Sequence, residues 1–316
     1  MEKEIYNYHL LSNGIKLIHK HADSSISHVG IVVNTGTRDE LKSENGIAHF
    51  IEHVIFKGTH KRSTYHVLSY LENIGGDLNA YTTKEETFFY ASLMNAYIER
   101  AVELLSDIVF HASFHKKDID TEKDVVIEEI KSYKDNPSEL IFDEFENLIF
   151  DGHPLGTNIL GSQSSVKKIN QQKIEQFIQR TYHTDQIVLA IVGNVPFKKC
   201  IRLAEKYLGI LKENRRNFQR LPFTDFRVEH QIKKHHGMQS HALIGQALPH
   251  FDEKKNHIAI LLNNILGGPG LNTRLNWAVR EKNGYVYTVE SSYAALSDGG
   301  LFNVYAAADA KNMDKT

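Results

Sequence analysis

Residues 46–56 read GIAHFIEHVIF, and their spacing predicts a buried helix. Five apolar residues recur at intervals of three and four positions, which is the period of one face of an α-helix. An α-helix turns by about 100° per residue, so side chains three and four positions apart lie on the same side. The apolar residues are Ile47, Phe50, Ile51, Val54 and Ile55. The helix is therefore expected to pack into the core and to hold its polar side chains in fixed positions.

The polar side chains of this helix are His49, Glu52 and His53, which fall together within about one turn. Two imidazoles at positions i and i+4 can hold one zinc ion from the same side. A carboxylate beside them can accept a proton from the water that the zinc activates, as in the H-x-x-E-H pattern that reverses H-E-x-x-H. The alternative is a pair of surface histidines beside a solvated glutamate. The apolar neighbours argue against it, because buried polar groups without partners are costly.

Length and composition limit the classes of protein to be considered. A chain of 316 residues can form two domains with sizeable cores. With 41% hydrophobic and 24% charged residues, the composition is ordinary for a globular protein. The formal net charge is -2 and no long basic run occurs, so nucleic acid is not an expected partner.

Three further features bear on location. No stretch approaches the roughly 20 apolar residues of a membrane span. Residues 1–16 contain no apolar run of the length found in secretory signals. Cys200 is the single cysteine, which excludes an internal disulfide and a Cys-rich zinc site and favours a reducing compartment. We therefore expect a cytoplasmic protein without a membrane span.

The rest of the chain predicts an α+β protein in which helices pack on antiparallel-rich sheets. A hairpin is expected within residues 6–19, and further strands at 27–35, 87–93, 186–192 and 241–248. Helices are expected at 64–74, 96–110, 121–133, 139–150, 166–181, 197–208 and 257–266. The Arg-containing segment 211–221 is the predicted linker, which gives a zinc-bearing domain at 1–215 and a second domain at 216–316.

The second domain weakly repeats the start of the first. In each, a strand leads through a polar loop to an apolar helix and then to a turn with glycines. When Ile258 is aligned with Ile47, the metal-type positions of the second copy are Ile260, Asn263 and Asn264. The second copy is therefore expected to be the same structural unit without the metal chemistry.

The predicted helix 121–133 carries a further carboxylate of interest. Its apolar face includes Glu122, Val125, Val126, Glu129 and Ile130, whereas Asp124, Glu128 and Lys131 share a purely charged face. A carboxylate on an apolar face needs a partner. For Glu129 that partner is either a Lys or Arg across an interface or a metal ion, and the pattern leaves both open.

Taken together, these residues resemble the M16 (pitrilysin/insulinase) family of inverzincin peptidases, and most closely its short-chain branch related to mitochondrial processing peptidase. The resemblance covers nearly the whole chain. The matching segments are His49–His53 with Phe56–Thr59, Asn79–Thr82 with Glu85 and Thr87, Glu122 with Glu129, His153–Gly156, Leu266–Gly268, Arg274–Leu275 and Arg280–Tyr287.

The resemblance implies a metal centre. Glu129 lies 76 residues beyond His53, the separation at which the family places its third ligand. His49, His53 and Glu129 would then bind Zn²⁺ and leave a fourth position for water. Glu52 would act as general base toward that water and later as proton donor to the leaving amine. Glu122, two helical turns before Glu129, would support the ligands from behind.

The resemblance also implies substrate-binding groups. Asn79, Ala80, Tyr81 and Thr82 match the edge-strand region against which family members lay an extended peptide. The alternative for Asn79 is an ordinary turn residue. Arg280 and Tyr287 match a pair from the second domain that stabilises the oxyanion. The alternative for this pair is a surface Arg and a core Tyr on one helix-like face.

In short-chain members one polypeptide makes half of a clamshell, with zinc supplied by one subunit and the Arg/Tyr pair by the other. This chain carries both sets, so the resemblance implies a homodimer or a heterodimer with a related subunit. Members of this branch are longer and have two similar halves. The second half here stops at Thr316, near where its second helical layer is expected, so the second unit is predicted to be incomplete.

The leading interpretation is a zinc-dependent endopeptidase that hydrolyses peptides or short unfolded segments. A second is a non-catalytic partner subunit that lends Arg280 and Tyr287 to another chain; the retained H-x-x-E-H residues argue against it. A third is a metal-binding protein without catalysis, which would not need Glu52.

Overall fold

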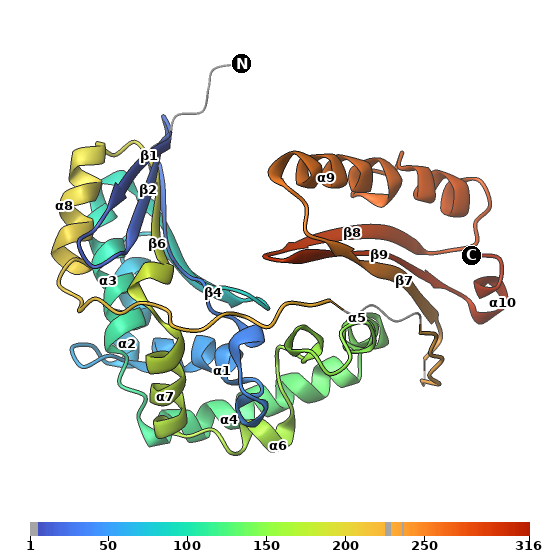
Figure 1. Cartoon of the computed structure of the whole chain (residues 1–316), viewed down its shortest axis with the longest axis horizontal. Coiled ribbons are helices and arrows are strands. Elements are labelled where there is room, and N and C mark those ends of the chain that lie inside the picture. Colours follow the sequence, from blue (N-terminus) through green and yellow to red (C-terminus); the bar gives the residue numbers. More distant parts are fainter. Residues whose placement is uncertain (1–5, 225–228, 236) are drawn as a thin grey trace. The chain divides into compact units, whose positions relative to one another are not determined.

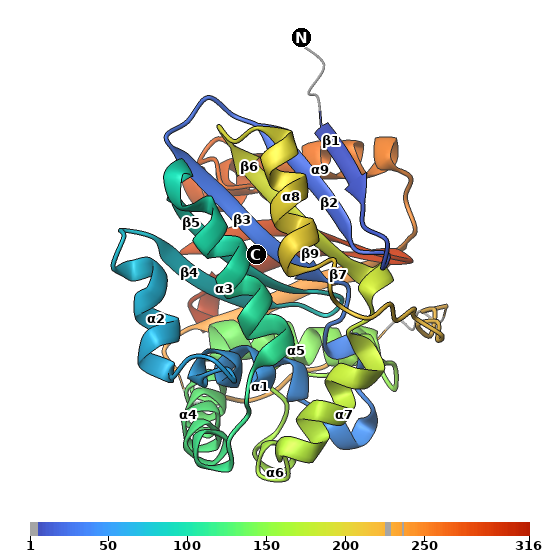
Figure 2. The same cartoon turned by 90° about the vertical axis from the view of Figure 1, so that its left-hand side faces the viewer.

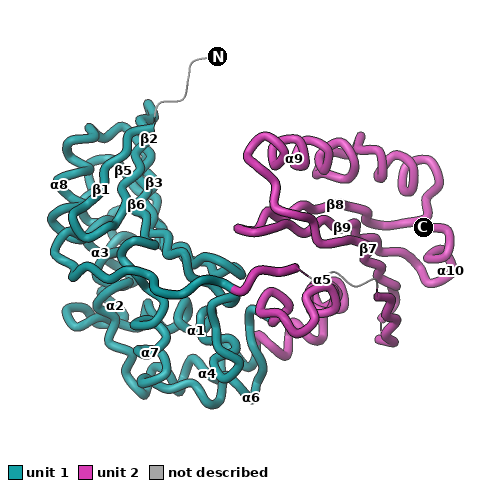
Figure 3. Tube along the Cα trace, in the orientation of Figure 1, with its two compact units in different colours: residues 1–128, 158–220 teal, residues 129–157, 221–316 magenta. Residues whose placement is uncertain are grey.

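The structure, a computed structural model, describes residues 6–224, 229–235 and 237–316. The chain divides into two units, residues 1–128 with 158–220 and residues 129–157 with 221–316, coloured teal and magenta in Figure 3. The division passes between Glu128 and Glu129, inside the long helix α4 (Lys116–Lys134). The predicted domain boundary after residue 215 stays a prediction.

Unit 1 is built on a six-stranded sheet in the order β1-β2-β6-β3-β5-β4. Its strands are β1 (Tyr6–Leu10), β2 (Lys16–His21), β3 (Ile26–Val33), β4 (Asp77–Thr82), β5 (Thr87–Met94) and β6 (Ile187–Gly193). Neighbouring strands are antiparallel except for β2 and β6, which are parallel. Alternate residues of β3, β5 and β6 are fully buried, as a sheet with one helix-covered face requires.

Helices cover one face of this sheet and surround its β4 end. They are α1 (Ile47–Val54), α2 (Thr64–Glu72), α3 (Ile98–His111), α6 (Gln163–Val166), α7 (Gln171–Thr181) and α8 (Phe197–Tyr207), with the greater part of α4. Figure 2 shows α3 and α8 lying across the sheet, and α3 packs against β3 and β5. α1 packs against the edge strand β4 and against α7. The metal-type helix is therefore placed beside an open sheet edge.

Unit 2 has a three-stranded antiparallel sheet in the order β7-β9-β8, drawn in orange to red in Figure 1. Its elements are α5 (Pro137–Ile149), β7 (Ser240–Pro249), α9 (Glu253–Gly267), a π-helical turn (Asn276–Glu281), β8 (Thr288–Leu296), β9 (Gly299–Ala308) and α10 (Ala310–Met313). The ring of Phe142 of α5 lies 5.2 Å from that of Tyr305 in a tilted arrangement, whereas α9 receives hydrogen bonds from Ser291 and Tyr293. These contacts lie on opposite faces of the sheet, since Ser291 pairs with Val304 and residues alternate along β9.

The two sheets confirm the predicted repeat. In unit 1, β3 pairs with β5 and β5 with β4; in unit 2, β7 pairs with β9 and β9 with β8, and all four pairings are antiparallel. α1 follows β3 just as α9 follows β7. The predicted α+β class with helix-packed, antiparallel-rich sheets is confirmed.

Some predicted elements are wrong in detail. The single helix expected at 166–181 is two helices, because the Asn170 side chain accepts a hydrogen bond from Lys173 N and starts α7 anew. On α4, Val125 was expected to be buried but is 47% exposed, and Ile127 is buried instead. Asn79 lies within β4, so the alternative of a turn residue is also wrong. Among the described residues, no helix combines the length and apolar character needed to cross a membrane.

Candidate metal centre

The N-terminus of α1 is fixed by a carboxylate and by a close backbone approach. Glu40 Oε2 accepts a hydrogen bond from Gly46 N and Oε1 from Ala48 N, each at 2.9 Å. These amides belong to the first turn, where helix N–H groups have no partner within the helix. Gly46 has a φ of +88°, and a Cβ there would lie 2.7 Å from Leu160 O. Only glycine fits this position, so the start of α1 is set by residues outside the helix.

α1 buries the apolar face that its sequence predicts. Ile47, Phe50, Ile51 and Val54 are each at most 1% exposed. His49 is also buried, whereas Glu52 and His53 are partly exposed. The helix therefore directs Glu52 and His53 away from its most buried stripe, whereas His49 is enclosed.

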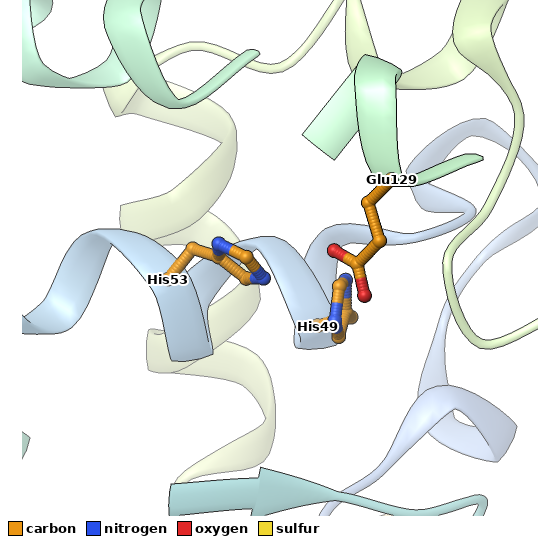
Figure 4. Close-up of side chains that lie close together, drawn as sticks. All are labelled: His49, His53 and Glu129. Atoms are coloured by element: carbon orange, nitrogen blue, oxygen red, sulfur yellow. The ribbon is translucent and has the colours of Figure 1, made fainter. Parts of the chain in front are cut away.

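Glu129 approaches these histidines from α4. One ring nitrogen of His49, one of His53 and one carboxylate oxygen of Glu129 all lie within 4.8 Å of one another. Figure 4 shows Glu129 extending from α4 toward the two imidazoles of α1. Of the two alternatives left open for Glu129 by its helix pattern, this juxtaposition favours metal binding. Glu128, one residue earlier, is exposed on the other side of α4, as its pattern predicts.

The donor set fits zinc. Two imidazoles and one carboxylate are the His₂Glu ligands of several hydrolytic zinc sites, which keep a fourth position open. Ligand atoms about 2.0–2.2 Å from one ion lie at most a little over 4 Å apart, so atoms within 4.8 Å need only small side-chain rotations. Among the described residues this is the one group of His, Cys, Asp and Glu with such geometry.

Glu122 and Lys57 lie behind the ligands. Glu122 Oε2 is 3.4 Å from His53 Nδ1, and Glu122 Oε1 is 2.6 Å from Lys57 Nζ. Glu122 is buried, and the nearby ammonium group of Lys57 favours the charged form of its carboxylate. A carboxylate on the second nitrogen of a metal-binding imidazole fixes the ring and its tautomer.

Tyr182 supplies a buried hydroxyl near Glu52. It follows α7, and burial raises the pKa of its hydroxyl well above the usual range, with the Glu52 charge acting in the same direction. Burial likewise raises the pKa of Glu40 to about 8, against the opposing effect of its two backbone hydrogen bonds. α1 thus has an ionisable group at its N-terminus, Glu40, and another, Tyr182, near Glu52.

The stretch predicted to bind substrate forms β4, an edge strand of the six-stranded sheet. Asn79 and Tyr81 are exposed and Ala80 is buried. Ala80 N donates to Asn79 Oδ1 at 2.8 Å. The Tyr81 ring lies 5.3 Å from that of Phe88 and 6.2 Å from that of Tyr90, between ring centroids. An extended peptide could pair with this free edge.

Arg280 and Tyr287 both lie in unit 2, but not on one helix face. Arg280 belongs to the π-helical turn, and Tyr287 comes directly before β8. Tyr287 is 54% exposed, so the alternative of a core tyrosine is wrong; its hydroxyl donates to Asp309 Oδ1 at 3.0 Å. Both side chains are accessible on unit 2.

A His₂Glu set carried on helices beside a further carboxylate is typical of the metal centres of zinc hydrolases. Comparison with known proteins then gives the family. The model of "Insulinase (Peptidase family M16)" matches residues 16–163, and that of "Peptidase M16 inactive domain" matches residues 168–316. The chain belongs to peptidase family M16.

Curated relatives are named as zinc proteases. The chain is 31% identical to the uncharacterized zinc protease YmxG of Bacillus subtilis, over 96% of this chain and 74% of that protein. It is 32% identical to an uncharacterized zinc protease of Mycobacterium leprae, over 94% of this chain and 68% of the relative.

Solved structures share the fold at low identity. A crystal structure described as a peptidase M16 inactive domain from Pseudomonas fluorescens superposes with a TM-score of 0.90 at 19% identity, over 97% of this chain and 75% of that one. A protease from Helicobacter pylori gives 0.89 at 21%, over 99% and 78%. The periplasmic protease PqqL from Escherichia coli gives 0.77 at 20%, over 98% and 36%.

Sequence reasoning missed two residues around α1. Lys57 stands out in the sequence only as part of the family pattern, and its pairing with Glu122 depends on two distant segments meeting. Glu40 reaches α1 across an irregular segment that has no hydrophobic period. The one local signal for Glu40 is an acidic residue shortly before a helix start, where carboxylates are favoured.

Proposed function

We propose that the chain is a zinc-dependent endopeptidase that hydrolyses peptides or short unfolded segments of proteins. The observation that carries the proposal is the meeting of His49 and His53 on α1 with Glu129 on α4. Membership of a family whose relatives are named zinc proteases supports the same conclusion.

His49, His53 and Glu129 would hold the metal. When bound, a zinc ion supplies a Lewis acid that polarises the scissile carbonyl and lowers the pKa of a water to about 7. Glu122 holds the His53 ring from behind, with Lys57 balancing its charge. These contacts keep the ligand nitrogens oriented before any metal or peptide arrives.

Glu52 has the role of proton carrier. It lies on α1 between the two histidines and is not needed as a ligand. Its carboxylate accepts a proton from the attacking water and then donates it to the departing amine nitrogen. Such positioned proton transfer contributes about 10²–10⁴-fold to rate.

β4 would bind the substrate backbone. Its free edge offers main-chain N–H and C=O groups at Asn79–Thr82 to an extended peptide, which gives affinity with modest sequence selectivity. Arg280 and Tyr287 are proposed to donate hydrogen bonds to the oxyanion, either within one chain or across a dimer. Such donors can each be worth about 2.7–4 kcal/mol of barrier. The dimer and the cytoplasmic location stay predictions.

The test compares wild type with Glu52→Gln, by metal mass spectrometry and by hydrolysis of a quenched fluorescent peptide. We expect about one zinc per chain in both proteins, because Glu52 is not a ligand. We expect at least about 10²-fold slower hydrolysis in the variant, because the proton carrier is lost. Glu72→Gln, at an exposed position of α2, is the control for an unspecific loss of charge.

The same experiment separates the alternatives. Zinc without hydrolysis in wild type would favour the non-catalytic partner subunit, and adding a candidate partner chain would then restore cleavage. Equal hydrolysis by wild type and Glu52→Gln would contradict the role of Glu52. Absence of metal from both would contradict the ligand assignment.

A further inference from the structure

The segment 211–220, predicted as a linker, is fastened to unit 1 by two arginines. It forms no helix or strand. Arg216 Nη2 donates to Asn34 O, and Arg216 N donates to Asp185 Oδ1 at 3.0 Å. Arg220 is the last residue of unit 1, and its side chain is 10% exposed. The last residues of unit 1 are therefore held by hydrogen bonds and do not form an unattached linker.

Arg220 binds two different loops at once. Its Nε and Nη2 donate to the two oxygens of Asp39, at 2.9 and 2.7 Å, in the fork geometry that suits a guanidinium. Nη2 also donates to Glu85 O at 2.6 Å, and Nη1 lies 3.5 Å from Glu85 Oε1. The Asp39 side chain has no exposed surface, so removal of the guanidinium would leave a buried charge without this partner.

Glu85 belongs to the hairpin turn between β4 and β5. Arg38 Nη1 donates to Glu85 Oε1 at 2.6 Å, and Arg38 N donates to Lys84 O at 2.7 Å. Thr37 N donates to Thr83 O, the residue that directly follows β4. The turn 83–86 is thus held both by the segment 37–39 and by Arg220.

The same short segment leads to the metal helix. Glu40, which caps α1 through Gly46 N and Ala48 N, is the neighbour of Asp39. Residues 38–40 therefore connect three parts of unit 1: the turn after β4, the guanidinium of Arg220 and the N-terminus of α1. All of these contacts lie within unit 1.

We propose that Arg220 is a positioning residue for peptide binding, which holds β4 in register beside α1 by joining Asp39 to the β4–β5 turn. The proposal rests on the proposed function, since it assumes that a peptide pairs with β4. Pairing along a strand edge depends on register, and a slip of one residue turns every side chain to the other face. Loosening the turn should therefore weaken peptide binding before it affects metal binding.

The variants are Arg220→Ala, Arg220→Lys and the control Arg215→Ala. Arg215 lies in the same segment, but its side chain is 75% exposed and pairs with Glu213 two residues away. Arg220→Lys keeps the charge but cannot contact both Asp39 oxygens and Glu85 O with a planar fork. It keeps the proposal testable if Arg220→Ala fails to fold.

The first readout is hydrogen–deuterium exchange of residues 77–86 in the zinc-loaded protein, which needs no catalysis. We expect at least about 10-fold faster exchange in Arg220→Ala, an intermediate increase in Arg220→Lys and none in Arg215→Ala. Exchange in α3, remote from the turn, should stay unchanged in the folded variants. Unchanged exchange at 77–86 in both Arg220 variants would overturn the proposal.

The second readout is KM against kcat for the quenched peptide. We expect KM to rise by about 10-fold in Arg220→Lys with kcat within about 3-fold of wild type, because binding is lost and the proton carrier is kept. A fall in kcat alone would contradict the positioning role. If wild type does not cleave, the proposed function fails separately, and the Kd of the same peptide for zinc-loaded protein decides the matter: an unchanged Kd in Arg220→Lys refutes the inference.

Discussion

α1 and α9 occupy the same position in the two repeats but differ in how far neighbouring elements bury their apolar side chains. Phe50 of α1 is fully buried, whereas Leu261, its counterpart on α9, is 60% exposed. Ile51 and Leu262 differ in the same way, at 0% and 61%. α1 packs against β4 and also against α7, whereas α9 packs against β8 and, in the part of unit 2 that is described, against no second helical layer.

The difference shows what the metal chemistry requires beyond the repeated unit. Strand order and the helix that follows the first strand are common to both copies. Of the two helices, α1 alone has a second helix, α4, that supplies a carboxylate, and a partly buried cap at Glu40. The two copies therefore share a scaffold of strands and one helix. The candidate metal centre depends on additional groups, α4 and Glu40, that surround α1.

The largest expected effect comes from replacing a ligand in one copy and its counterpart in the other. His53→Ala should lower the zinc content from about one per chain to near zero and abolish hydrolysis, because two ligands seldom hold zinc. Asn264→Ala, at the aligned exposed position of α9, should leave both unchanged. Metal mass spectrometry and the peptide assay measure this pair. An equal loss of zinc and of hydrolysis in the two variants would contradict the assignment of the metal site to the first copy alone.

The next effect concerns packing. Phe50→Ala should lower the free energy of unfolding by about 3–5 kcal/mol, because the ring is fully buried. Leu261→Ala should change it by less than about 0.5 kcal/mol, because its side chain is already largely in water. Urea unfolding followed by circular dichroism measures both, and Trp277, the single tryptophan, reports unit 2 by fluorescence. A cost above about 2 kcal/mol for Leu261→Ala would show that α9 is covered in solution.

The third effect concerns the caps and depends on pH. The pKa of Glu40 is raised to about 8 in the folded chain, whereas an unfolded chain releases this proton near 4.3. Since the folded state then binds more protons between these values, the contribution of Glu40 to stability is full at acid pH and is lost as the pH rises through 8. Glu40→Gln should remove this fall in the free energy of unfolding.

The matched control is Asp252→Asn at the cap of α9, where the exposed Asp252 accepts a hydrogen bond from Lys255 N. Chemical denaturation between pH 5 and about 9 measures the profiles of both variants. Parallel profiles for wild type and Glu40→Gln would contradict the raised pKa of Glu40 at this cap.

Sequence patterns predicted those helices whose faces and ends are determined by residues within or next to the helix itself. The face of α1 is dense in apolar side chains at helical spacing, and the start of α5 follows from Asn136 and Pro137, where the Asn side chain accepts from Ser138 N. The positions of the histidines and of Glu129 followed from such helices together with the family resemblance. How α1 meets α4 required the tertiary structure.

Contacts between distant segments could not be predicted. The pattern of residues 211–221 predicts a linker, and nothing in it indicates that Arg216 will bind Asn34 or that Arg220 will bind Asp39. The exposure of Val125 has the same cause: the pattern of α4 gives the helix a face, and neighbouring helices decide which part is covered. Tyr287 does not share a helix face with Arg280, because the chain turns at Gly284, where φ is +63°.

The free edge of β4 has a consequence for handling the protein. An edge strand can pair with any extended chain, including β4 of another molecule, so this edge can promote self-association. The exposed Asp77 at the start of β4 places a charge where strands of two molecules would meet, which opposes this pairing. We expect Asp77→Asn to make concentrated, peptide-free protein aggregate more readily, and a short extended peptide to act as a stabilising additive.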